Sequence, residues 1–362
     1  MSRQPPEQRS GKCLGRATLS ASARAPAIVT GDGETWPLVL KSVQSSITNT
    51  PQGRARSRTA VQIMQVSCTT VEEMVLQLAE LDNPPHRTGA SPAAIISHYD
   101  MGEEFFQLVL DPDLVYSCAL FEAGDSLWDA QRRKLDHHIQ ASGAATAKRV
   151  LDIGCGWGAL LRRLSDHWGV ENAVGLTLSP SQANFIRRMP RKGLEVMEQD
   201  WRDHRPSAPY DAIISIGAFE HFVQKGLPAS IKLSSYREFF DACGRMLKPG
   251  GKLSLQTIAY TQPTPPHPYL EQTFPESELP MIWEPIAAAE QSFRLIMLQD
   301  NGAEYDKTIQ IWEKNLKSNF DKAIQLVGEP AAHSFRRYLR LSRIGFKHGI
   351  VGLLRMSFVK RD

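Results

Sequence analysis

From about residue 149 onward, short apolar runs alternate with segments whose apolar residues recur every three or four positions. The apolar runs predict five β-strands, at residues 149–154, 172–179, 194–200, 210–217 and 252–260. The segments between them predict helices at 158–169, 179–189 and from 236 to a Pro-Gly-Gly turn at 249–251. This alternation indicates an α/β fold in which helices cover both faces of a parallel sheet. A ligand of such a sheet binds beyond the carboxyl ends of its strands.

The first ninety residues lack this order. Residues 1–57 carry scattered Gly, Pro, Ser and Arg, and helical spacing returns only at 69–81. The stretch NPPHRTGASP that follows is typical of a linker. We therefore expect an N-terminal extension over residues 1–90, partly a disordered leader and including one short helix, followed by one domain over residues 91–362 that carries the strand and helix pattern.

The bulk properties favour a globular cytoplasmic protein. Hydrophobic residues make up 42% of the chain, which predicts a substantial core, and a net charge of +3 is too small to indicate nucleic-acid binding. The five cysteines lie far apart and include no CxxC pair, which argues against a disulfide framework or a zinc site. No apolar run approaches the roughly 20 residues that span a bilayer. The basic run at 336–347 is typical of a solvated helix face, with peripheral membrane contact as the alternative.

The turn after the first predicted strand reads LDIGCGWG, with glycines at 154, 156 and 158 and an acid, Asp152, just before them. Glycines let the backbone turn tightly and approach a ligand closely. The spacing is GxGxG rather than the GxGxxG of dinucleotide sites, and this pattern is typical of enzymes that bind S-adenosylmethionine. The second strand ends in the neutral residues Thr177 and Leu178, with Gln182 one turn into the next helix, so neutral groups must contact the ribose.

Seven segments resemble the cyclopropane-fatty-acid synthase family, which includes the mycolic acid cyclopropane synthases. In order along residues 98 to 359 they are HYDMGEEFFQLVLDPDLVYSCALFE, LDIGCGWGALL, VGLTLSPSQA, SIGAFEHF, FPESELP, EYDKTIQIWEKNL and YLRLSRIGFKHGIVGLLRMSF. The resemblance implies a Rossmann-like class I methyltransferase with a mostly parallel seven-stranded sheet and helices on both faces. It also implies an antiparallel C-terminal edge strand and a helical lid over the site.

The resemblance assigns cofactor contacts position by position. Around the methionine end and the glycine turn it implies Tyr99, Tyr116, Ser117, Asp152, Gly154 and Gly156. For the ribose it implies Thr177, Leu178 and Gln182, and for the adenine Trp201. An indole face after the third strand suits a flat base, although Trp201 would equally suit ordinary core packing.

The stretch SIGAFEHF places Glu220 and His221 among phenylalanines at the end of the fourth strand. Ionised carboxylates avoid apolar surroundings unless something pairs with them or the protein uses them. We therefore expect Glu220 to be a catalytic group at the mouth of the sheet, and His221 to pack or cap nearby. In the family a bicarbonate ion acts as the base, and the matching positions here are Glu220, Cys118, Tyr305 and the backbone around Ile258.

One position departs from the family pattern. The family typically reads HTI in the fifth strand, whereas this chain reads QTI, with Gln256. An amide donates a hydrogen bond but carries no charge and shuttles no proton. Either bicarbonate still binds through Gln256, Cys118 and Tyr305, or Glu220 is itself the base and the substrate is something other than a simple lipid alkene. We favour Glu220, because a neutral site beside a carboxylate binds an anion less well.

The resemblance implies a C-methyltransferase that adds a methyl group to an alkene carbon of a lipid or other small molecule. The resulting carbocation would lose a proton to give a cyclopropane or a methylated alkene. An N-methyltransferase acting on a small amine is the alternative, and a non-enzymatic binding protein is disfavoured by the intact cofactor turn and acidic centre. The proline-rich segment 261–285 is expected to cover the substrate pocket, with Tyr269, Phe274 and Trp283 as candidate walls.

Overall fold

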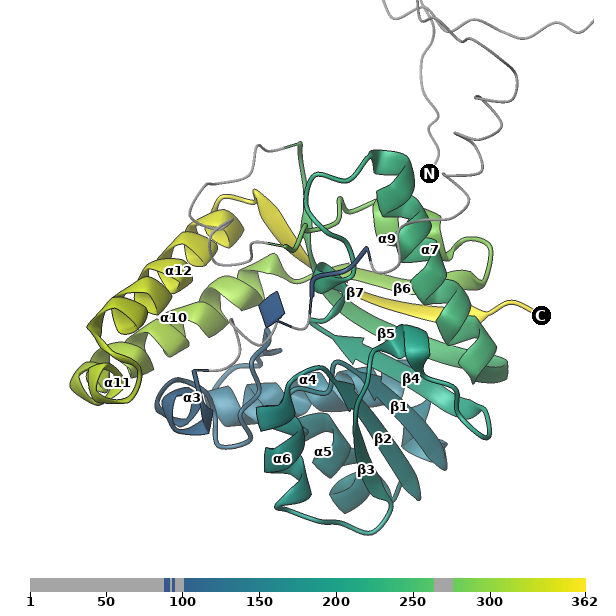
Figure 1. Ribbon diagram of the computed structural model, residues 1–362, viewed down its shortest axis with the longest axis horizontal. Helices are drawn as coiled ribbons and strands as arrows, with labels where there is room; N and C mark the ends of the chain where they lie inside the picture. The colour runs from purple at the N-terminus through teal and green to yellow at the C-terminus, as the bar shows by residue number, and fades with distance from the viewer. Residues whose placement is uncertain (1–87, 92, 95–100, 264–275) are drawn as a thin grey trace, which may run out of the picture. The chain divides into compact units, whose positions relative to one another are not determined.

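The computed structural model describes residues 88–91, 93, 94, 101–263 and 276–362 (Figure 1). The expected leader and the helix at 69–81 lie outside these residues, as do Tyr99, Tyr269 and Phe274.

A seven-stranded sheet forms the centre of the described structure (Figure 1). Its strands, in the order β3-β2-β1-β4-β5-β7-β6, have these bounds: β1 Arg149–Ile153, β2 Asn172–Thr177, β3 Leu194–Glu198, β4 Tyr210–Ile216, β5 Leu247–Tyr260, β6 Phe293–Asp300 and β7 Val351–Lys360. The first five pair in parallel, which confirms the five predicted strands. The C-terminal strand β7 is antiparallel, as expected, but it lies between β5 and β6, so that β6 forms the edge of the sheet.

Two predicted boundaries differ from the structure. Helix α7 spans Ala229–Met246 and thus begins seven residues before the predicted start, directly after Pro228. The predicted Pro-Gly-Gly turn is an irregularity within β5, because Leu247 pairs with Tyr210 while Lys252 pairs with Ala212. The extra residues of β5 are accommodated there, and Gly250 takes a φ of 69° that favours glycine.

Helices cover both faces of the sheet. On one face lie α4 Leu127–Ala141, α5 Ala159–Trp168 and α6 Pro180–Arg187, and on the other lie α7 and α9 Glu284–Ala289. Successive strand residues point to opposite faces, so Val150 packs with the first group while Leu151 packs with the second. Helix α6 begins where the sequence predicted, because the Ser179 hydroxyl accepts a hydrogen bond from the Gln182 amide and Pro180 occupies the first helical position.

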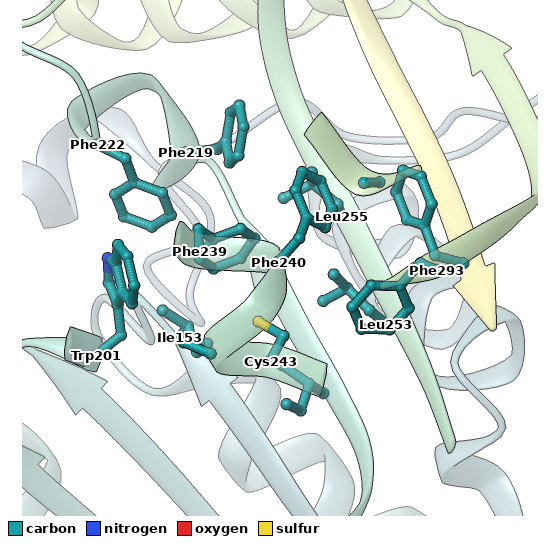
Figure 2. Packing of buried hydrophobic residues seen from close by; sticks show 14 of the residues in the cluster. Ile153, Trp201, Phe219, Phe222, Phe239, Phe240, Cys243, Leu253, Leu255 and Phe293 are labelled. Atoms are coloured by element: carbon teal, nitrogen blue, oxygen red, sulfur yellow. The ribbon is translucent and has the colours of Figure 1, made fainter. Parts of the chain in front are cut away.

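A cluster of aromatic side chains joins the end of β4 to α7 (Figure 2). The short 3₁₀ helix Phe219–His221 follows β4, and the Phe219 ring stacks on Tyr236 with centroids 4.5 Å apart. Phe240 is fully buried, and its ring makes edge contacts with Phe239 and Phe358. This packing fixes the backbone that carries Glu220.

A second helical group comprises α3 Glu103–Val109, α10 Gly302–Ser318, α11 Phe320–Val327 and α12 Glu329–Lys347. These helices share one hydrophobic cluster, which also contains Cys118, Trp157 and Tyr305. The group carries Tyr305, on α10, but none of its four helices contributes a residue to the lining of the cavity described below. In the described part of the chain, no helix is both long enough and apolar enough to cross a membrane.

The aromatic cluster gives a direct test of the fold. Replacing the buried Phe240 by alanine removes a ring that contacts α7, β6 and β7, and we expect it to lower the free energy of unfolding by about 3–5 kcal/mol. Urea unfolding followed by circular dichroism measures this. As a control, Ile296→Ala, at a side chain 40% exposed on β6, should cost less than about 1 kcal/mol. Equal losses in the two variants would contradict the packing described here.

Candidate active site

The glycine turn after β1 is held against the end of β2. The amides of Gly154 and Cys155 both donate to the Leu176 carbonyl, at 3.0 and 2.9 Å. Gly154 has a φ of 80°, and a Cβ atom there would overlap the Cβ of Ala218. Gly156 has a φ of 51° and open space where its side chain would be. The turn therefore requires glycine at both positions, for close packing at one and for ligand approach at the other.

A cavity opens beyond the carboxyl ends of β1, β2 and β4, where the sequence predicted the ligand. Nine of the ten cofactor residues named from the sequence line it, and Tyr99 lies outside the described residues. The nine are Tyr116, Ser117, Asp152, Gly154, Gly156, Thr177, Leu178, Gln182 and Trp201. Residues that lie more than eighty positions apart in the sequence, such as Tyr116 and Trp201, thus line the same cavity.

Polar groups at the end of β2 are ordered by hydrogen bonds. The Thr177 hydroxyl accepts from the Ser179 amide at 3.1 Å and donates to Gln182 Oε1 at 2.8 Å. Since Oε1 of Gln182 is occupied, its amide nitrogen is the end that can donate to a ligand. This arrangement suits the neutral ribose contact expected from the sequence.

Trp201 packs in the core and also borders the cavity, so its position is compatible with both roles that the sequence left open. It lines the cavity and is only 5% exposed, and its ring packs edge-on against Phe239 at 5.4 Å. The guanidinium of Arg202 lies 4.2 Å from the indole centroid. The indole ring of Trp201 thus packs against the core, and the same residue forms part of the cavity wall.

Lys134, on α4, lines the same cavity and was not predicted from the sequence. Its side chain is 1% exposed, and Nζ donates to the Ser117 hydroxyl at 2.8 Å. One turn earlier, Nε2 of Gln131 donates to the carbonyl of Ser117 at 2.8 Å. The feature of the sequence that could have indicated Lys134 is its position on the apolar face of an amphipathic helix, beside Leu135 and Ile139.

His221 also lines the cavity, in addition to the packing expected of it. Its Nδ1 atom lies 2.7 Å from the hydroxyl of Ser277. Burial lowers the pKa of His221 to about 4, so the ring is neutral at pH 7. The candidate wall Trp283, by contrast, is 51% exposed.

Glu220 is buried and is not itself among the residues that line the cavity, although Ala218, two positions before it, and His221, directly after it, do line it. Its Oε1 atom accepts a hydrogen bond from the Ile258 amide at 2.6 Å. Its Oε2 atom is buried and has no hydrogen-bond partner among the described residues. Burial raises the pKa of this carboxyl to about 7, and hydrogen bonds from the Ile258 amide, from its own backbone amide and from the Thr257 hydroxyl only partly offset the effect.

Cys118 and Tyr305 come from distant segments into one hydrophobic cluster, against which Ile258 also packs. Burial raises the pKa of the Cys118 thiol to about 12, so it is a neutral thiol rather than a nucleophile. The Tyr305 ring lies 4.6 Å from Phe346 and 6.0 Å from Trp312. Through Ile258, this cluster adjoins the carboxylate of Glu220.

The surroundings of Gln256 differ from the neutral site assumed from the sequence. Nε of Arg355, on the neighbouring strand β7, donates to Gln256 Oε1 at 2.9 Å, and His138 Nε2 lies 3.3 Å from the same oxygen. A guanidinium has only donors, so the atom of Gln256 that faces Arg355 is its side-chain oxygen, and the amide nitrogen is the end of Gln256 that can donate. Arg355 is fully buried, and its Nη2 lies 3.6 Å from Cys118 Sγ. The Arg355 guanidinium therefore places a positive charge beside Cys118, although the family's histidine is absent.

Comparison with known proteins agrees with this geometry. Residues 86–356 match the family model described as mycolic acid cyclopropane synthetase. Cyclopropane mycolic acid synthase 1 of Mycobacterium tuberculosis is 32% identical over 282 residues, which cover 70% of this chain and 93% of that protein. Hydroxymycolate synthase MmaA4 of the same organism is 30% identical over 292 residues, covering 73% of this chain and 91% of that protein.

A solved structure shows the same fold. The crystal structure of mycolic acid cyclopropane synthase CmaA1 complexed with SAH and CTAB matches with a TM-score of 0.67 and 31% identity. The match covers 76% of this chain and 99% of that one. The chain therefore belongs to the mycolic acid cyclopropane synthase family and is an S-adenosylmethionine-dependent methyltransferase.

Proposed function

We propose that this enzyme methylates an alkene carbon of a lipid or natural product, and that Glu220 then removes a proton from the resulting carbocation. The observation that carries the proposal is the Oε2 atom of Glu220, which is buried and unpartnered among the described residues and belongs to a carboxyl of pKa about 7. A general base is most effective when its pKa lies near the working pH. A carboxyl with no such task would be costly to bury in this way.

The described residues fit the expected cofactor, because the glycine turn leaves open space at Gly156 and because Gln182 and Trp201, which would contact the nucleoside, line the cavity. When bound, S-adenosylmethionine supplies an electrophilic methyl group that an alkene can take up, leaving a carbocation on the other alkene carbon. The chain's own task is then to shield that cation from water and to accept its proton.

Aromatic side chains in the hydrophobic cluster of helices α3, α10, α11 and α12 suit this shielding. The rings of Tyr116 and Trp312 lie 5.3 Å apart, and Tyr305 meets the edge of Trp312. Aromatic faces attract a positive charge without reacting with it. Proton loss from the added methyl carbon closes a cyclopropane, whereas loss from a neighbouring carbon leaves a methylated alkene. In either case the bond to hydrogen passes its electron pair to carbon, and Glu220 receives the proton.

The bicarbonate of the family is the alternative base. The groups that would hold it are the guanidinium of Arg355, the amide nitrogen of Gln256, Cys118 and Tyr305. The buried guanidinium supplies a positive charge that was not predicted from the sequence. The Ile258 amide, however, is already hydrogen-bonded to Glu220 Oε1. That contact orients the carboxylate and supports Glu220 as the direct base.

The substrate class is tested by incubating the protein with methyl-labelled S-adenosylmethionine and a panel of unsaturated lipids, isoprenoids and amines. We expect label in an alkene-bearing compound, as a cyclopropane or a new methyl branch. Label found only in an amine would reject this proposal in favour of an N-methyltransferase. Turnover that requires added bicarbonate in carbonate-free buffer would reject Glu220 as the direct base.

Glu220→Gln tests the role of the carboxylate, because glutamine keeps the acceptor for the Ile258 amide but cannot take up a proton. We expect turnover to fall by at least about 100-fold while the dissociation constant for S-adenosylhomocysteine changes little. Glu171→Gln, at an exposed side chain paired with Lys148, is the matched control and should keep full turnover. Retained turnover in Glu220→Gln would show that the carboxylate is not the base.

The same substitution should stabilise the protein in a pH-dependent way. The folded-state pKa of about 7 lies above the ordinary value of 4.5, so ionised Glu220 disfavours the folded state. We expect Glu220→Gln to raise the free energy of unfolding by up to about 3 kcal/mol at pH 8, the gain shrinking between pH 7 and 4.5 and absent below. Urea unfolding at several pH values measures this, and a gain that is equal at pH 4 and pH 8 would contradict it.

A further inference from the structure

The turn that leads into Tyr116 contains an unfavourable backbone conformation. Among the residues that the structure describes, Leu114 is the one non-glycine residue with a positive φ, which is 58°. This left-handed region is costly for an L-residue with a Cβ atom, and leucine has no polar side-chain group that would compensate. Such a conformation persists only where the surrounding structure holds it, and it is typical of functional sites.

Hydrogen bonds on both sides of Leu114 hold this conformation. The carboxylate of Asp111, which is 4% exposed, accepts from the amides of Asp113 at 3.0 Å and Val115 at 2.9 Å. The Asp111 carbonyl accepts from the Leu114 amide at 2.9 Å. From α5, Nη2 of Arg162 donates to the Asp113 carbonyl at 3.0 Å. The turn is therefore fixed by a buried carboxylate and fastened to a neighbouring helix.

The side chain of Leu114 belongs to two neighbouring regions of the structure. It lines the cofactor cavity, and it also packs in the hydrophobic cluster that contains Cys118 and Tyr305. Pro112, two positions earlier, is exposed, whereas Leu114 is 4% exposed and is the first buried residue after it. Glycine would adopt this backbone at lower cost, so the benefit of leucine must come from its apolar side chain.

We propose that Leu114 determines the product by keeping water away from the carbocation, an inference that rests on the mechanism given under the proposed function. The cation either loses a proton, which gives the cyclopropane or methylated alkene, or is captured by water. In capture, a lone pair of the water oxygen forms a bond to the cationic carbon, and that oxygen passes a proton to Glu220. The product is then an alcohol that has gained both a methyl and a hydroxyl group. The leucine side chain favours proton loss because it closes the way from the exposed turn into the cavity and the cluster.

Ordinary core packing is the competing explanation for Leu114, and Leu110 is the matched control. Leu110 lies four positions earlier in the same cluster, is 6% exposed and is not among the residues that line the cavity. Its φ of −87° is unstrained. If Leu114 served packing alone, truncation of the two leucines should have the same consequences.

The stability of glycine and alanine variants tests the strained backbone independently of turnover. At an unstrained buried position glycine destabilises more than alanine, and we expect this order at Leu110. At Leu114 glycine relieves the left-handed conformation, so Leu114→Gly should unfold at a higher urea concentration than Leu114→Ala. If Leu114→Gly instead unfolds at the lower concentration, the leucine is not held under strain and the proposal loses its basis.

Product analysis in oxygen-18-enriched water tests the role of the side chain. The reagents are methyl-labelled S-adenosylmethionine and the alkene-bearing compound that the unmodified protein methylates. For Leu114→Ala we expect at least about a tenth of the labelled product to be an alcohol carrying oxygen-18, and at least about tenfold less alcohol from Leu110→Ala and the unmodified protein. Equal alcohol fractions in the two variants, or none from Leu114→Ala, would overturn the proposal.

Two further outcomes are decisive. Should Leu114→Ala fail to fold, Asp111→Ala, which loosens the turn but keeps the leucine, must yield the labelled alcohol, and a product free of alcohol would overturn the proposal. An unmodified protein that methylates no alkene would contradict the proposed function itself, and this inference with it. Methylation by the unmodified protein without alcohol from the variants would contradict the role of Leu114 alone.

Discussion

The hydrogen bond from the Ile258 amide to Glu220 Oε1 is the contact on which the site depends. It ties the 3₁₀ helix after β4 to the neighbouring strand β5 and holds one carboxylate oxygen while the other stays buried without a partner in the described structure. The ring of Phe219, one residue before Glu220, packs against Tyr236 and Phe239 of α7 and so ties this short helix to α7 (Figure 2). A group that would ordinarily ionise at pH 4.5 is thereby kept near the midpoint of its titration at neutral pH.

Two buried cations lie close to each other: burial lowers the pKa of Lys134, and the Arg355 guanidinium lowers it further. Helix α4 contributes Lys134 toward the cofactor cavity, and strand β7 contributes Arg355 toward Cys118 and Gln256. Among the described residues neither cation forms an ion pair: Lys134 donates to the Ser117 hydroxyl, and Arg355 donates to Gln256 Oε1 and the Ala119 carbonyl. The site is therefore not electrostatically neutral, even though the position of the family's histidine holds an amide.

Much of this could be predicted from the sequence. Apolar runs marked all five parallel strands, and the glycine spacing with Asp152 located the cavity, because these signals are local in the chain. The place of β7 inside the sheet and the early start of α7 could not be predicted, since both depend on packing between distant segments. Arg355 was missed for the same reason: its partner Gln256 is ninety-nine residues away and becomes its neighbour only through strand pairing.

The central claim is that Glu220 is a buried carboxyl that titrates near neutrality. The most direct measurement is a carboxyl titration by carbon-13 NMR of protein labelled at the glutamate side-chain carboxyls, with the Glu220 signal assigned by its absence in Glu220→Gln. The account predicts a signal that titrates with a pKa of about 7. A Glu220 signal that titrates at or below 4.5 would contradict it.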